Sequence, residues 1–420
     1  TRSMSTAPST DPQHILVVGS SLAGLRACET LRQEGFAGRV TLVGAESEMP
    51  YDRPPLSKKL LAGEWEPDRI RLRKADDFES LGLAMVFGQR ATALDTTERR
   101  VTLADGSTLA YDGLVIATGS APRRLPNQPQ LDGVLELRTL ADSMYLRGRI
   151  ADGSARVVVI GAGFVGLEVA ATARQKGCAV TVLEGSAAPL MRGLGAEMGV
   201  AAASVHGRNG VDLRCGVQVK AIEGDGSRVT GVRLADDSVV PADVVVVGVG
   251  VAPAVEWLDG SGLALRDGLV CDVNLCAGVA GVYAAGDCVR WPNGVYFGHD
   301  DCDMRVEHWT NAAEQGAAAA RNLLASFRGG EQVPFESVPF FWSDQFDSRI
   351  QFVGRAHGGD DLHLVAGSYD GAFAVLYGWE GRLRGALGVS MPRMVMPFRQ
   401  LVGEKASWSD ALALAHSLTR

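Results

Sequence analysis

Long hydrophobic segments are missing from this chain of 420 residues. The longest candidate, VVVVGVGVAPAV at 244–255, is far shorter than the roughly 20 apolar residues that a membrane-spanning helix needs, and glycines interrupt it. It predicts a buried strand followed by a turn. The first residues, 1–13, are polar and carry no apolar core of the signal-peptide kind, so we expect a flexible N-terminus and no membrane association.

An excess of positive charge and a disulfide framework are also missing. The formal net charge is −8, and an acidic chain is a poor general binder of nucleic acid. The seven cysteines are scattered and odd in number, and none lies between Cys28 and Cys178. This pattern favours reduced thiols and a cytoplasmic location. We expect no metal site.

Glycine, in contrast, is abundant, with 51 residues, and one glycine-rich turn follows the apolar strand 15–18. A helical pattern over 22–34 and a strand over 39–46, which ends on Glu46, complete a βαβ unit. The turn has Gly19 and Gly24, but Ser21 occupies the position where a middle glycine normally lets the backbone approach a pyrophosphate. Serine adds only a hydroxymethyl group, which can donate a hydrogen bond to phosphate. We therefore expect a dinucleotide here, and a vestigial turn is the alternative.

The same pattern recurs over 156–184 with an intact turn made of Gly161, Gly163 and Gly166. Its second strand ends on Glu184, which can accept hydrogen bonds from the ribose hydroxyls of an adenosine and would repel a 2′-phosphate. This favours NADH over NADPH, whereas a solvated strand-end glutamate is the alternative. One such turn is a weak signal, but two in one chain strongly predict two dinucleotide sites.

Each βαβ unit is followed by a hairpin and a returning strand, over 99–120 and 229–250, which indicates an internal duplication. A short strand at 281–291 contains Gly286–Asp287, and an alanine-rich helix is expected over 311–327. From Glu331 onward the pattern changes to short aromatic strands with turns and a last helix over 408–418. This tail predicts a separate α+β domain.

The loop EMPYDRPPLSKKLL at 48–61 places Arg53 and Lys58 beside prolines that stiffen the chain. A cation in a rigid loop directly after the first βαβ unit could reach an electron-rich cofactor. The alternative is a solvated run of charge.

Eight short segments of the sequence occur in the same order as the corresponding motifs of one protein family. They are GSSLAG, PYDRPPLSK, IATGS, GAGFVGLE, GVGVAP, YAAGD, EHWTNAAEQG and FFWSDQF. With them the chain resembles the FAD-dependent, NADH-using ferredoxin reductases, such as putidaredoxin and rubredoxin reductases, from about His14 to Val402. The pieces PYDRPPLSK and FWSDQ are the more specific, because many flavoenzymes share the glycine turns.

The resemblance implies a glutathione-reductase-like α/β fold with two Rossmann-like dinucleotide-binding domains and a C-terminal α+β domain. The expected bounds are 14–118 and 247–328 for a discontinuous FAD domain, 119–246 for the NAD domain and 329–420 for the C-terminal domain.

The resemblance also implies the site residues. Lys58, near flavin N5, and its acidic partner Glu168 are the expected catalytic residues. The expected FAD-binding residues are Gly19, Ser21, Leu22, Ala23, Gly24, Glu46, Arg53, Lys58, Ala117, Thr118, Gly119, Gly286, Asp287, Glu307, His308, Trp309 and Trp342. The expected NAD-binding residues are Gly161, Gly163, Phe164, Val165, Gly166, Glu184 and Gly250.

The implied activity is that of a ferredoxin–NAD⁺ reductase. NADH would reduce FAD, and a [2Fe–2S] ferredoxin would carry the electrons to a cytochrome P450 or a Rieske-type oxygenase. Disulfide reductases of this architecture need a cysteine pair beside the flavin, and the loop after Glu46 has no cysteine. Two alternatives stay open: an NADH oxidase or small-acceptor reductase of the monodehydroascorbate type, and a flavin-binding NADH sensor.

Docking of an acidic ferredoxin would require a local basic surface on this acidic chain. The candidates are Arg69, Arg71, Arg73, Lys74 and Arg305. The expected assembly is a monomer or a homodimer.

Overall fold

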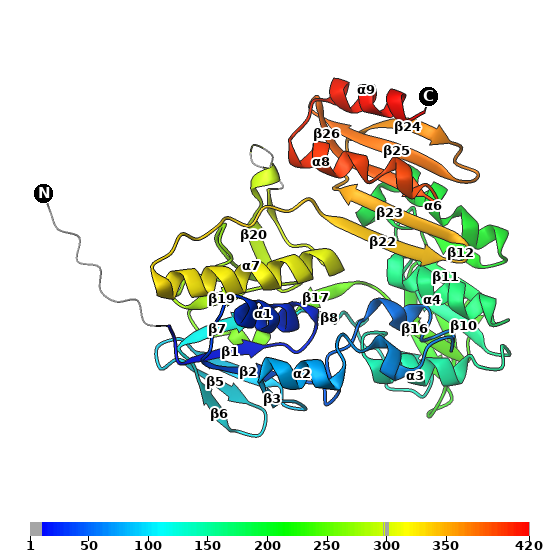
Figure 1. Cartoon of the computed structure of the whole chain (residues 1–420). Coiled ribbons are helices and arrows are strands. Elements are labelled where there is room, and N and C mark those ends of the chain that lie inside the picture. Colours follow the sequence, from blue (N-terminus) through cyan, green and yellow to red (C-terminus); the bar gives the residue numbers. More distant parts are fainter. Residues whose placement is uncertain (1–10, 297, 299–301, 420) are drawn as a thin grey trace, which may run out of the picture. The chain divides into compact units, whose positions relative to one another are not determined.

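The computed structural model describes residues 11–296, 298 and 302–419, so most of the expected flexible N-terminus lies outside the described residues. The chain forms two compact units, and each unit is assembled from three separate segments. Unit 1 comprises Thr1–Asp52, Arg71–Ala121 and Ala252–Pro339, and unit 2 comprises Arg53–Ile70, Pro122–Val251 and Phe340–Arg420. Figure 1 colours the chain by its position in the sequence, from blue at the N-terminus to red at the C-terminus.

Unit 1 is built on a five-stranded parallel sheet of order β19-β7-β1-β2-β3. Its central strand β1 is a continuous apolar run because a parallel sheet is covered on both faces. Residues Ile15 to Val18 are accordingly almost fully buried. The strands are β1 (His14–Val18), β2 (Arg39–Val43), β3 (Ala84–Val86), β7 (Gly113–Ile116) and β19 (Val282–Ala284).

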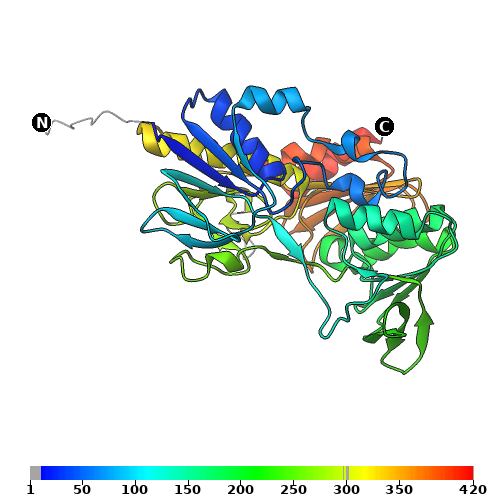
Figure 2. The same cartoon turned by 90° about the horizontal axis from the view of Figure 1, so that it is seen from below.

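Two helices of unit 1, α1 (Leu22–Gln33) and α7 (Trp309–Arg328), lie side by side over this sheet (Figure 1). A side-chain carbon at Gly316 of α7 would lie 2.3 Å from the Ala23 carbonyl oxygen of α1. The close crossing of the two helices therefore needs glycine at position 316. Figure 2 shows the same sheet from below, with β1 and α1 in dark blue.

The remaining elements of unit 1 are short. They are α2 (Ala75–Leu81), the antiparallel strands β4 (Ala91–Asp95), β5 (Arg100–Leu103) and β6 (Thr108–Ala110), and the small sheet of β18 (Leu269–Val270), β20 (Val289–Pro292) and β21 (Asp303–Met304). Two 3₁₀ turns cover Glu256–Leu258 and Gly294–Tyr296. The chain changes from one unit to the other at five points, and two of them lie within β8 (Ser120–Pro122) and β17 (Val251–Pro253).

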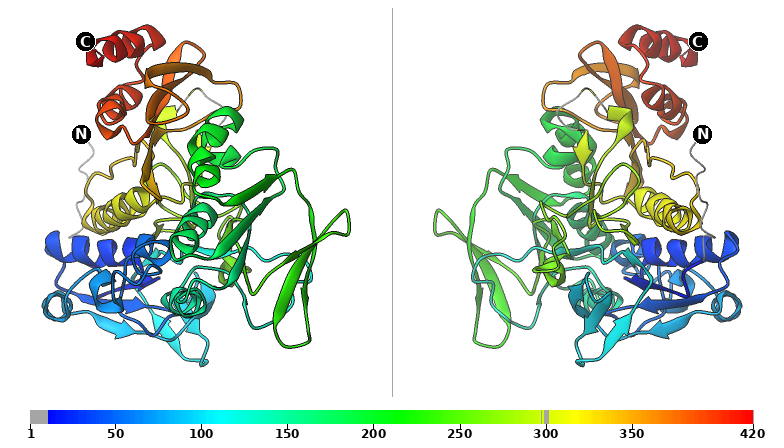
Figure 3. Two further views of the ribbon diagram at one scale, coloured as in Figure 1. Left: turned by 90° about the vertical axis from the view of Figure 1, so that its right-hand side faces the viewer. Right: turned by 90° about the vertical axis from the view of Figure 1, so that its left-hand side faces the viewer.

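Unit 2 repeats the plan with a parallel sheet of order β12-β11-β10-β16-β9. The strands are β9 (Val134–Leu135), β10 (Arg156–Ile160), β11 (Ala179–Glu184), β12 (Asp212–Cys215) and β16 (Val244–Val247). The helices are α3 (Leu140–Arg149), α4 (Phe164–Gln175), α5 (Met191–Leu194) and α6 (Ala196–Arg208). The strands β13 (Val219–Gly224), β14 (Val229–Leu234) and β15 (Val239–Pro241) form a sheet of their own (Figure 3).

The C-terminal part of unit 2 is an antiparallel sheet of order β22-β23-β26-β25-β24. It comprises β22 (Phe340–Gln345), β23 (Ser348–Gly354), β24 (Asp361–Gly367), β25 (Phe373–Trp379) and β26 (Arg382–Val389), followed by α8 (Pro397–Gly403) and α9 (Trp408–Leu418). Three further 3₁₀ turns of unit 2 cover Pro54–Ser57, Pro67–Ile70 and Pro392–Met394. The helix expected over 408–418 is present with those bounds.

One hydrophobic core joins the two sheets of unit 2. Leu167 and Met198 from the parallel-sheet side share it with Phe352 and Tyr377 from the antiparallel sheet. The buried Tyr377 hydroxyl also donates a hydrogen bond of 2.9 Å to the Leu194 carbonyl oxygen. The antiparallel sheet is thereby part of the same compact unit as the second dinucleotide fold.

The architecture confirms the predicted fold class, with two Rossmann-like folds and a C-terminal α+β part. The bounds of three separate domains stay a prediction. Among the described residues, the structure contains no helix that combines the length and the apolar character needed to span a bilayer.

Candidate functional site

The first glycine-rich turn lies between the carboxyl end of β1 and the start of α1. Gly19 has φ of +119°, and a side-chain carbon there would lie 2.0 Å from the Ala117 carbonyl oxygen. A side-chain carbon at Gly24 would lie 1.8 Å from the Gly19 carbonyl oxygen. Both positions therefore require glycine. The turn thus lies beside the predicted segment 117–119.

Ser21 is the residue that precedes α1, and its backbone is extended, with φ of −92° and ψ of −162°. Any residue adopts this conformation, so the backbone does not require glycine here. In the described structure the Ser21 side chain makes no capping hydrogen bond to the helix. The first N–H groups of α1 are thus not satisfied by this side chain. A phosphate at this helix N-terminus fits that donor set.

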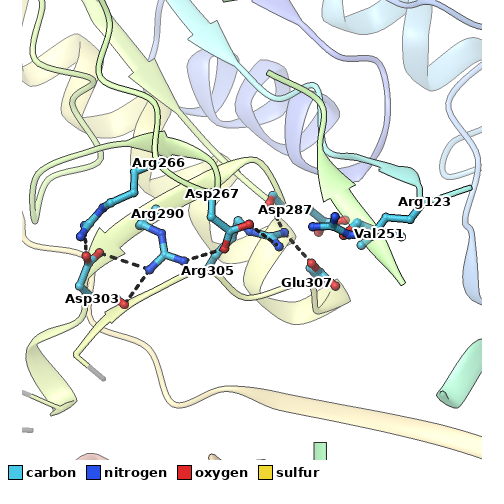
Figure 4. Close-up of polar contacts among 9 residues, drawn as sticks. All are labelled: Arg123, Val251, Arg266, Asp267, Asp287, Arg290, Asp303, Arg305 and Glu307. Carbon is cyan, nitrogen blue, oxygen red and sulfur yellow. Dashed lines mark hydrogen bonds and ion pairs between the residues drawn. The ribbon is translucent and has the colours of Figure 1, made fainter. Parts of the chain in front are cut away.

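The turn Gly286–Asp287 follows β19, and three side chains from other elements hold it. The Gly286 amide donates to Gln315 Oε1 over 2.8 Å, and Ser120 Oγ donates to Asp287 Oδ2 over 2.8 Å. Arg305 Nη1 donates to the Asp287 carbonyl oxygen over 3.1 Å (Figure 4). The other amide atom of Gln315, Nε2, is buried and finds no partner among the described residues. It is a donor available to a polar group of a ligand.

Arg305 belongs to a network of ion pairs within unit 1 (Figure 4). Its guanidinium pairs with Glu307 at 2.5 Å and with Asp267 at 3.5 Å. Arg290 bonds the same Asp267 at 2.7 Å. Only 7% of the Arg305 side chain is exposed. The prediction that Arg305 is a surface cation for docking is therefore wrong, because its charge is neutralised and buried in this network.

Two further contacts within unit 1 involve predicted FAD-binding residues. Tyr51 donates from its hydroxyl to the Glu46 carboxylate, which fixes that acid just beyond β2. Trp309 Nε1 donates to Asp52 Oδ1 over 2.7 Å at the first turn of α7. Glu307 and His308 directly precede this helix. Arg305 Nη1 connects Glu307 with the Gly286–Asp287 turn, because it donates to both the Glu307 carboxylate and the Asp287 carbonyl oxygen.

The second glycine-rich turn, in unit 2, repeats the first. A side-chain carbon at Gly161 would lie 2.3 Å from the Gly248 oxygen, and one at Gly166 would lie 2.3 Å from the Gly161 oxygen. At Gly163 it would meet no described atom within 4 Å. The space before α4 is therefore open to a phosphate. Gly250, with φ of +102°, lies just beyond β16.

The residues that follow this turn differ in exposure. Phe164 packs against Phe341, with 4.6 Å between ring centroids, whereas Val165 is half exposed. The Glu184 carboxylate accepts hydrogen bonds of 2.7 Å from the Ala162 and Ser186 amides. Glu184 is therefore held at the mouth of the turn by two backbone donors.

Lys58 and Glu168 form an ion pair within unit 2, with 2.8 Å between Lys58 Nζ and Glu168 Oε2. The side chains are only 15% and 6% exposed. Ser57 Oγ donates to the same carboxylate oxygen over 2.5 Å, and Ser343 Oγ donates to Oε1 over 2.7 Å. The structure thus brings together the two residues predicted to be catalytic.

The loop that carries Lys58 is fixed by its backbone. Prolines occupy the first two positions of the 3₁₀ turn Pro54–Ser57, where their fixed φ suits the turn. Ser143 of α3 donates to the Leu56 carbonyl over 2.7 Å, and Thr172 of α4 donates to the Ser57 carbonyl over 2.8 Å. These bonds are buried and anchor the residues immediately before Lys58.

Arg53 and Trp342 are the other predicted FAD-binding residues in unit 2. Arg53 Nη1 donates to the Arg138 carbonyl oxygen over 2.6 Å. Trp342 lies on β22, one residue before the Ser343 that contacts Glu168.

Several residues that contact the predicted site were not expected from the sequence. They are Ser57, Thr172 and Ser343 around Lys58 and Glu168, and Ser120 and Gln315 around Asp287. One signal could have found Ser343. Ser343 and Gln345 are the two buried residues of β22, which begins with three aromatic residues. Buried polar side chains need hydrogen-bond partners.

Two family comparisons cover most of the chain. Residues 13–316 match the family described as pyridine nucleotide-disulphide oxidoreductase, and residues 340–418 match the family described as reductase C-terminal. The chain belongs to the pyridine nucleotide-disulphide oxidoreductase family. The predicted family and its oxidoreductase class are thereby confirmed.

Individual relatives agree with this assignment. The chain is 37% identical over 390 residues to the rhodocoxin reductase of Rhodococcus erythropolis, covering 92% of this chain and 89% of that protein. It is 34% identical to the putidaredoxin reductase of Pseudomonas putida, covering 93% and 92%. The structure of a covalent putidaredoxin reductase–putidaredoxin complex superposes with a TM-score of 0.87 at 32% identity, covering 94% of each chain.

Proposed function

We propose that this chain is an NADH-dependent FAD flavoprotein that passes electrons to a [2Fe–2S] ferredoxin, which in turn serves a cytochrome P450 or a Rieske-type oxygenase. The observation that carries the proposal is the buried Lys58–Glu168 ion pair in a chain without a cysteine between Cys28 and Cys178. The loop that carries Lys58 thus has no redox-active cysteine to receive electrons, so the acceptor must be another molecule.

The residues present fit both cofactors. For FAD, the uncapped N-terminus of α1 would receive the pyrophosphate, and Glu46 would bind the adenosine ribose. Asp287 would bind the ribityl chain, and the unpartnered Nε2 of Gln315 lies next to the same turn. The other FAD-binding residues predicted from the sequence, Arg53 and Trp342 among them, remain part of this proposal.

For NADH, the open space at Gly163 would admit the pyrophosphate to the N-terminus of α4. Glu184 would accept from the ribose hydroxyls with the lone pairs that the Ala162 and Ser186 amides leave available. Its negative charge disfavours a 2′-phosphate, which supports a preference for NADH over NADPH.

When bound, FAD accepts a hydride from NADH and can release the two electrons one at a time. The contribution of the chain is electrostatic. The Lys58 ammonium supplies positive charge that stabilises a reduced flavin, and Glu168 holds that ammonium in place. The Glu168 carboxylate also favours a positively charged nicotinamide ring. Because both side chains are mostly buried, water screens these interactions weakly.

An acidic ferredoxin is the partner in this proposal, and exposed cations would receive it. Arg71 and Lys74 are exposed in unit 1, and Arg69 is exposed in unit 2. Arg73 is less suitable because its guanidinium pairs with Glu29 at 2.6 Å. Reductase activity should therefore fall as ionic strength rises. A flat response to salt would remove electrostatic docking from the proposal.

A cytoplasmic location and a monomeric or homodimeric state belong to the same proposal. All seven cysteines are free, which supports a reducing compartment. Sedimentation at several protein concentrations would distinguish the monomer from the dimer.

The test is NADH-driven reduction of cytochrome c by the purified protein, with and without an added [2Fe–2S] ferredoxin. Strong dependence on ferredoxin is the expected result. Rapid oxidation of NADH that no ferredoxin changes would favour the small-acceptor alternative. A change of oligomeric state on addition of NADH, with slow turnover, would favour the sensor. A colourless protein that stays inactive after addition of FAD would contradict the cofactor assignment.

A further inference from the structure

The Glu168 carboxylate is the end of a hydrogen-bonded chain that continues through the interior of unit 2. Ser343 Oγ donates to Glu168 Oε1 over 2.7 Å, and Gln345 Nε2 donates to Ser343 Oγ over 3.0 Å. Gln345 Oε1 lies 2.8 Å from His206 Nε2. All four side chains are buried, at most 5% exposed. Three separate elements, α4, β22 and α6, therefore contribute to one polar chain.

The chemistry of the groups fixes the direction of this chain. An amide oxygen only accepts, so His206 must carry its proton on Nε2 and donate to Gln345. The Gln345 amide nitrogen then donates to Ser343, whose hydroxyl proton is left for Glu168. Every donor points toward the carboxylate, and aligned hydrogen bonds polarise one another.

His206 is suited to be the neutral end of the chain. Its Nδ1 is buried and has no partner among the described residues, so a proton there would be unsatisfied. Burial accordingly lowers the pKa of His206. Its ring packs edge-on against Phe346, with centroids 5.2 Å apart, which fixes the ring orientation.

We propose that His206, Gln345 and Ser343 are positioning residues that hold the Glu168 carboxylate in the orientation that fixes the Lys58 ammonium. The importance of this positioning for flavin chemistry rests on the function proposed above. The effect of the three residues on Glu168 and Lys58 does not depend on that function. Ser57 donates to Oε2, and Lys58 forms its ion pair with the same oxygen. Ser343, the last member of the hydrogen-bonded chain, is the only donor to Oε1 among the described residues. Loss of that donor leaves the carboxylate held through Oε2 alone, which loosens its orientation and its hold on Lys58.

The test measures the reactivity of the Lys58 amine in the purified holoprotein. Brief treatment with acetic anhydride, followed by mass spectrometry of peptides, reports how fast each lysine is acetylated. Lys220, exposed on β13 and paired with Asp237, is the internal reference. The variants are Ser343→Ala, Gln345→Met, His206→Phe and His206→Gln.

We expect Ser343→Ala and Gln345→Met to speed acetylation of Lys58 by roughly three- to tenfold, which is the size expected for loss of one typical buried hydrogen bond. His206→Phe, which keeps aromatic packing but removes the donor, should act in the same direction. His206→Gln keeps a donor near the position of Nε2 and should restore the parent rate. Lys220 should react alike in all variants.

The matched control is Tyr377→Phe. It removes a buried hydrogen bond to the Leu194 carbonyl oxygen, which lies in the same unit but does not belong to the hydrogen-bonded chain. It should lower the melting temperature without changing the Lys58 rate. An unchanged Lys58 rate in Ser343→Ala and Gln345→Met would overturn the proposal, as would equal rates in the two His206 variants. If one variant does not fold, as judged by circular dichroism, the remaining variants decide.

A second readout separates this inference from the proposed function. The long-wavelength absorbance of the NADH-treated protein should weaken in the variants whose Lys58 reacts faster. Faster acetylation with unchanged absorbance and unchanged ferredoxin reduction would keep the hydrogen-bonded chain but refute the role of Lys58 in the proposed function. Lost activity with unchanged acetylation of Lys58 would refute the positioning role of the hydrogen-bonded chain and leave the proposed function standing.

Discussion

At the scale of single residues, backbone conformation decides which side chains the two glycine-rich turns accept. Gly19 and Gly161 have strongly positive φ and close carbonyl neighbours, so neither can be replaced without strain. Ser21 is extended and caps nothing, so its hydroxyl is available to a ligand. A departure from the glycine fingerprint can thus coexist with an intact fold and with a helix N-terminus that the Ser21 side chain does not cap.

Ser21→Ala should weaken FAD binding, because a hydrogen bond to a charged group contributes about 1.5–3 kcal/mol, which corresponds to a dissociation constant raised roughly tenfold or more. Ser21→Gly is the matched control, since glycine permits closer approach of the backbone and should bind FAD nearly as well as the parent. Fluorescence titration of the FAD-free protein measures both constants. Equal affinity of Ser21→Ala and the parent would show that the hydroxyl does not bind phosphate.

Lys58→Gln should slow NADH-driven reduction of ferricyanide, an acceptor that needs no ferredoxin docking, by on the order of a hundredfold. Glu168→Gln should act in the same direction, because the ammonium loses the carboxylate that holds it at 2.8 Å. Stopped-flow absorbance of the flavin measures the step directly. Lys59→Gln is the control, since Lys59 lies over the Trp65 ring and should leave the rate unchanged. Parent-like rates in Lys58→Gln would contradict the electrostatic role.

At the scale of elements, the strands and the turns between them were predictable because their signals are local. Apolar runs predict buried parallel strands, and the repetition of strand, glycine turn and helix predicts both dinucleotide folds. The helix α6 was not expected, since its segment contains Gly199 and Gly207, which weaken a helical pattern. Gly199 is needed there because a side-chain carbon would lie 2.1 Å from the Pro189 carbonyl oxygen.

The candidate site was predictable only in part, because sequence signals are local and some contacts of the site are not. Lys58, Glu168 and the glycines stand in recognisable motifs. The partners of Glu168 come from distant parts of the sequence, and Ser343 is 175 residues away from it. No local pattern can relate two such residues, since their contact depends on how β22 packs beside α4. The polar alternation in β22 shows that its buried face needs partners, but not which partners.

The junction between β10 and β16 offers a prediction on pH. Asp243, just before β16, accepts hydrogen bonds from the Arg156 amide, Nε and Nη2 at 2.7–2.9 Å. The hydrogen bond with the Arg156 side chain lowers the pKa of Asp243 from 3.8 to about 2. Because the folded pKa is the lower one, the ionised form stabilises the fold above pH 3.8. This stabilisation disappears as the pH falls through about 2.

Asp243→Asn should therefore lower the melting temperature at pH 6 and have a smaller effect at pH 3. The difference should be modest, since both side chains are about half exposed and water screens the pair. Calorimetry across this range measures it. The same loss at both pH values would mean that packing, and not charge, explains the effect of the substitution.

At the scale of the whole molecule, the distribution of thiols bears on the path of the electrons. Burial raises the pKa of Cys28 to about 12 and that of Cys288 to about 11, so both are protonated and unreactive near neutral pH. All seven cysteines are free, and none follows Cys28 before Cys178. Electron transfer that avoids thiols is consistent with this arrangement.

Treatment with N-ethylmaleimide at pH 7 should leave ferredoxin reduction unchanged. The reagent should reach at most the three partly exposed thiols, Cys215, Cys276 and Cys302. Mass spectrometry identifies the modified residues, and a disulphide reductase with a redox-active cysteine pair serves as the sensitive control. Inactivation in proportion to labelling, with protection by NADH, would indicate that a thiol takes part after all.

The assembly of unit 1 from three separate segments has a consequence for biosynthesis. Strand β19 completes the sheet by pairing with β7, yet it is translated only after the long stretch between Ala121 and Ala252. At about 5–20 residues per second, the ribosome needs on the order of ten seconds for that stretch. During this time the nascent chain exposes the open edge of β7, and exposed edges promote aggregation. The yield of active protein should therefore depend on translation speed and on the chaperones that shield this edge until β19 emerges.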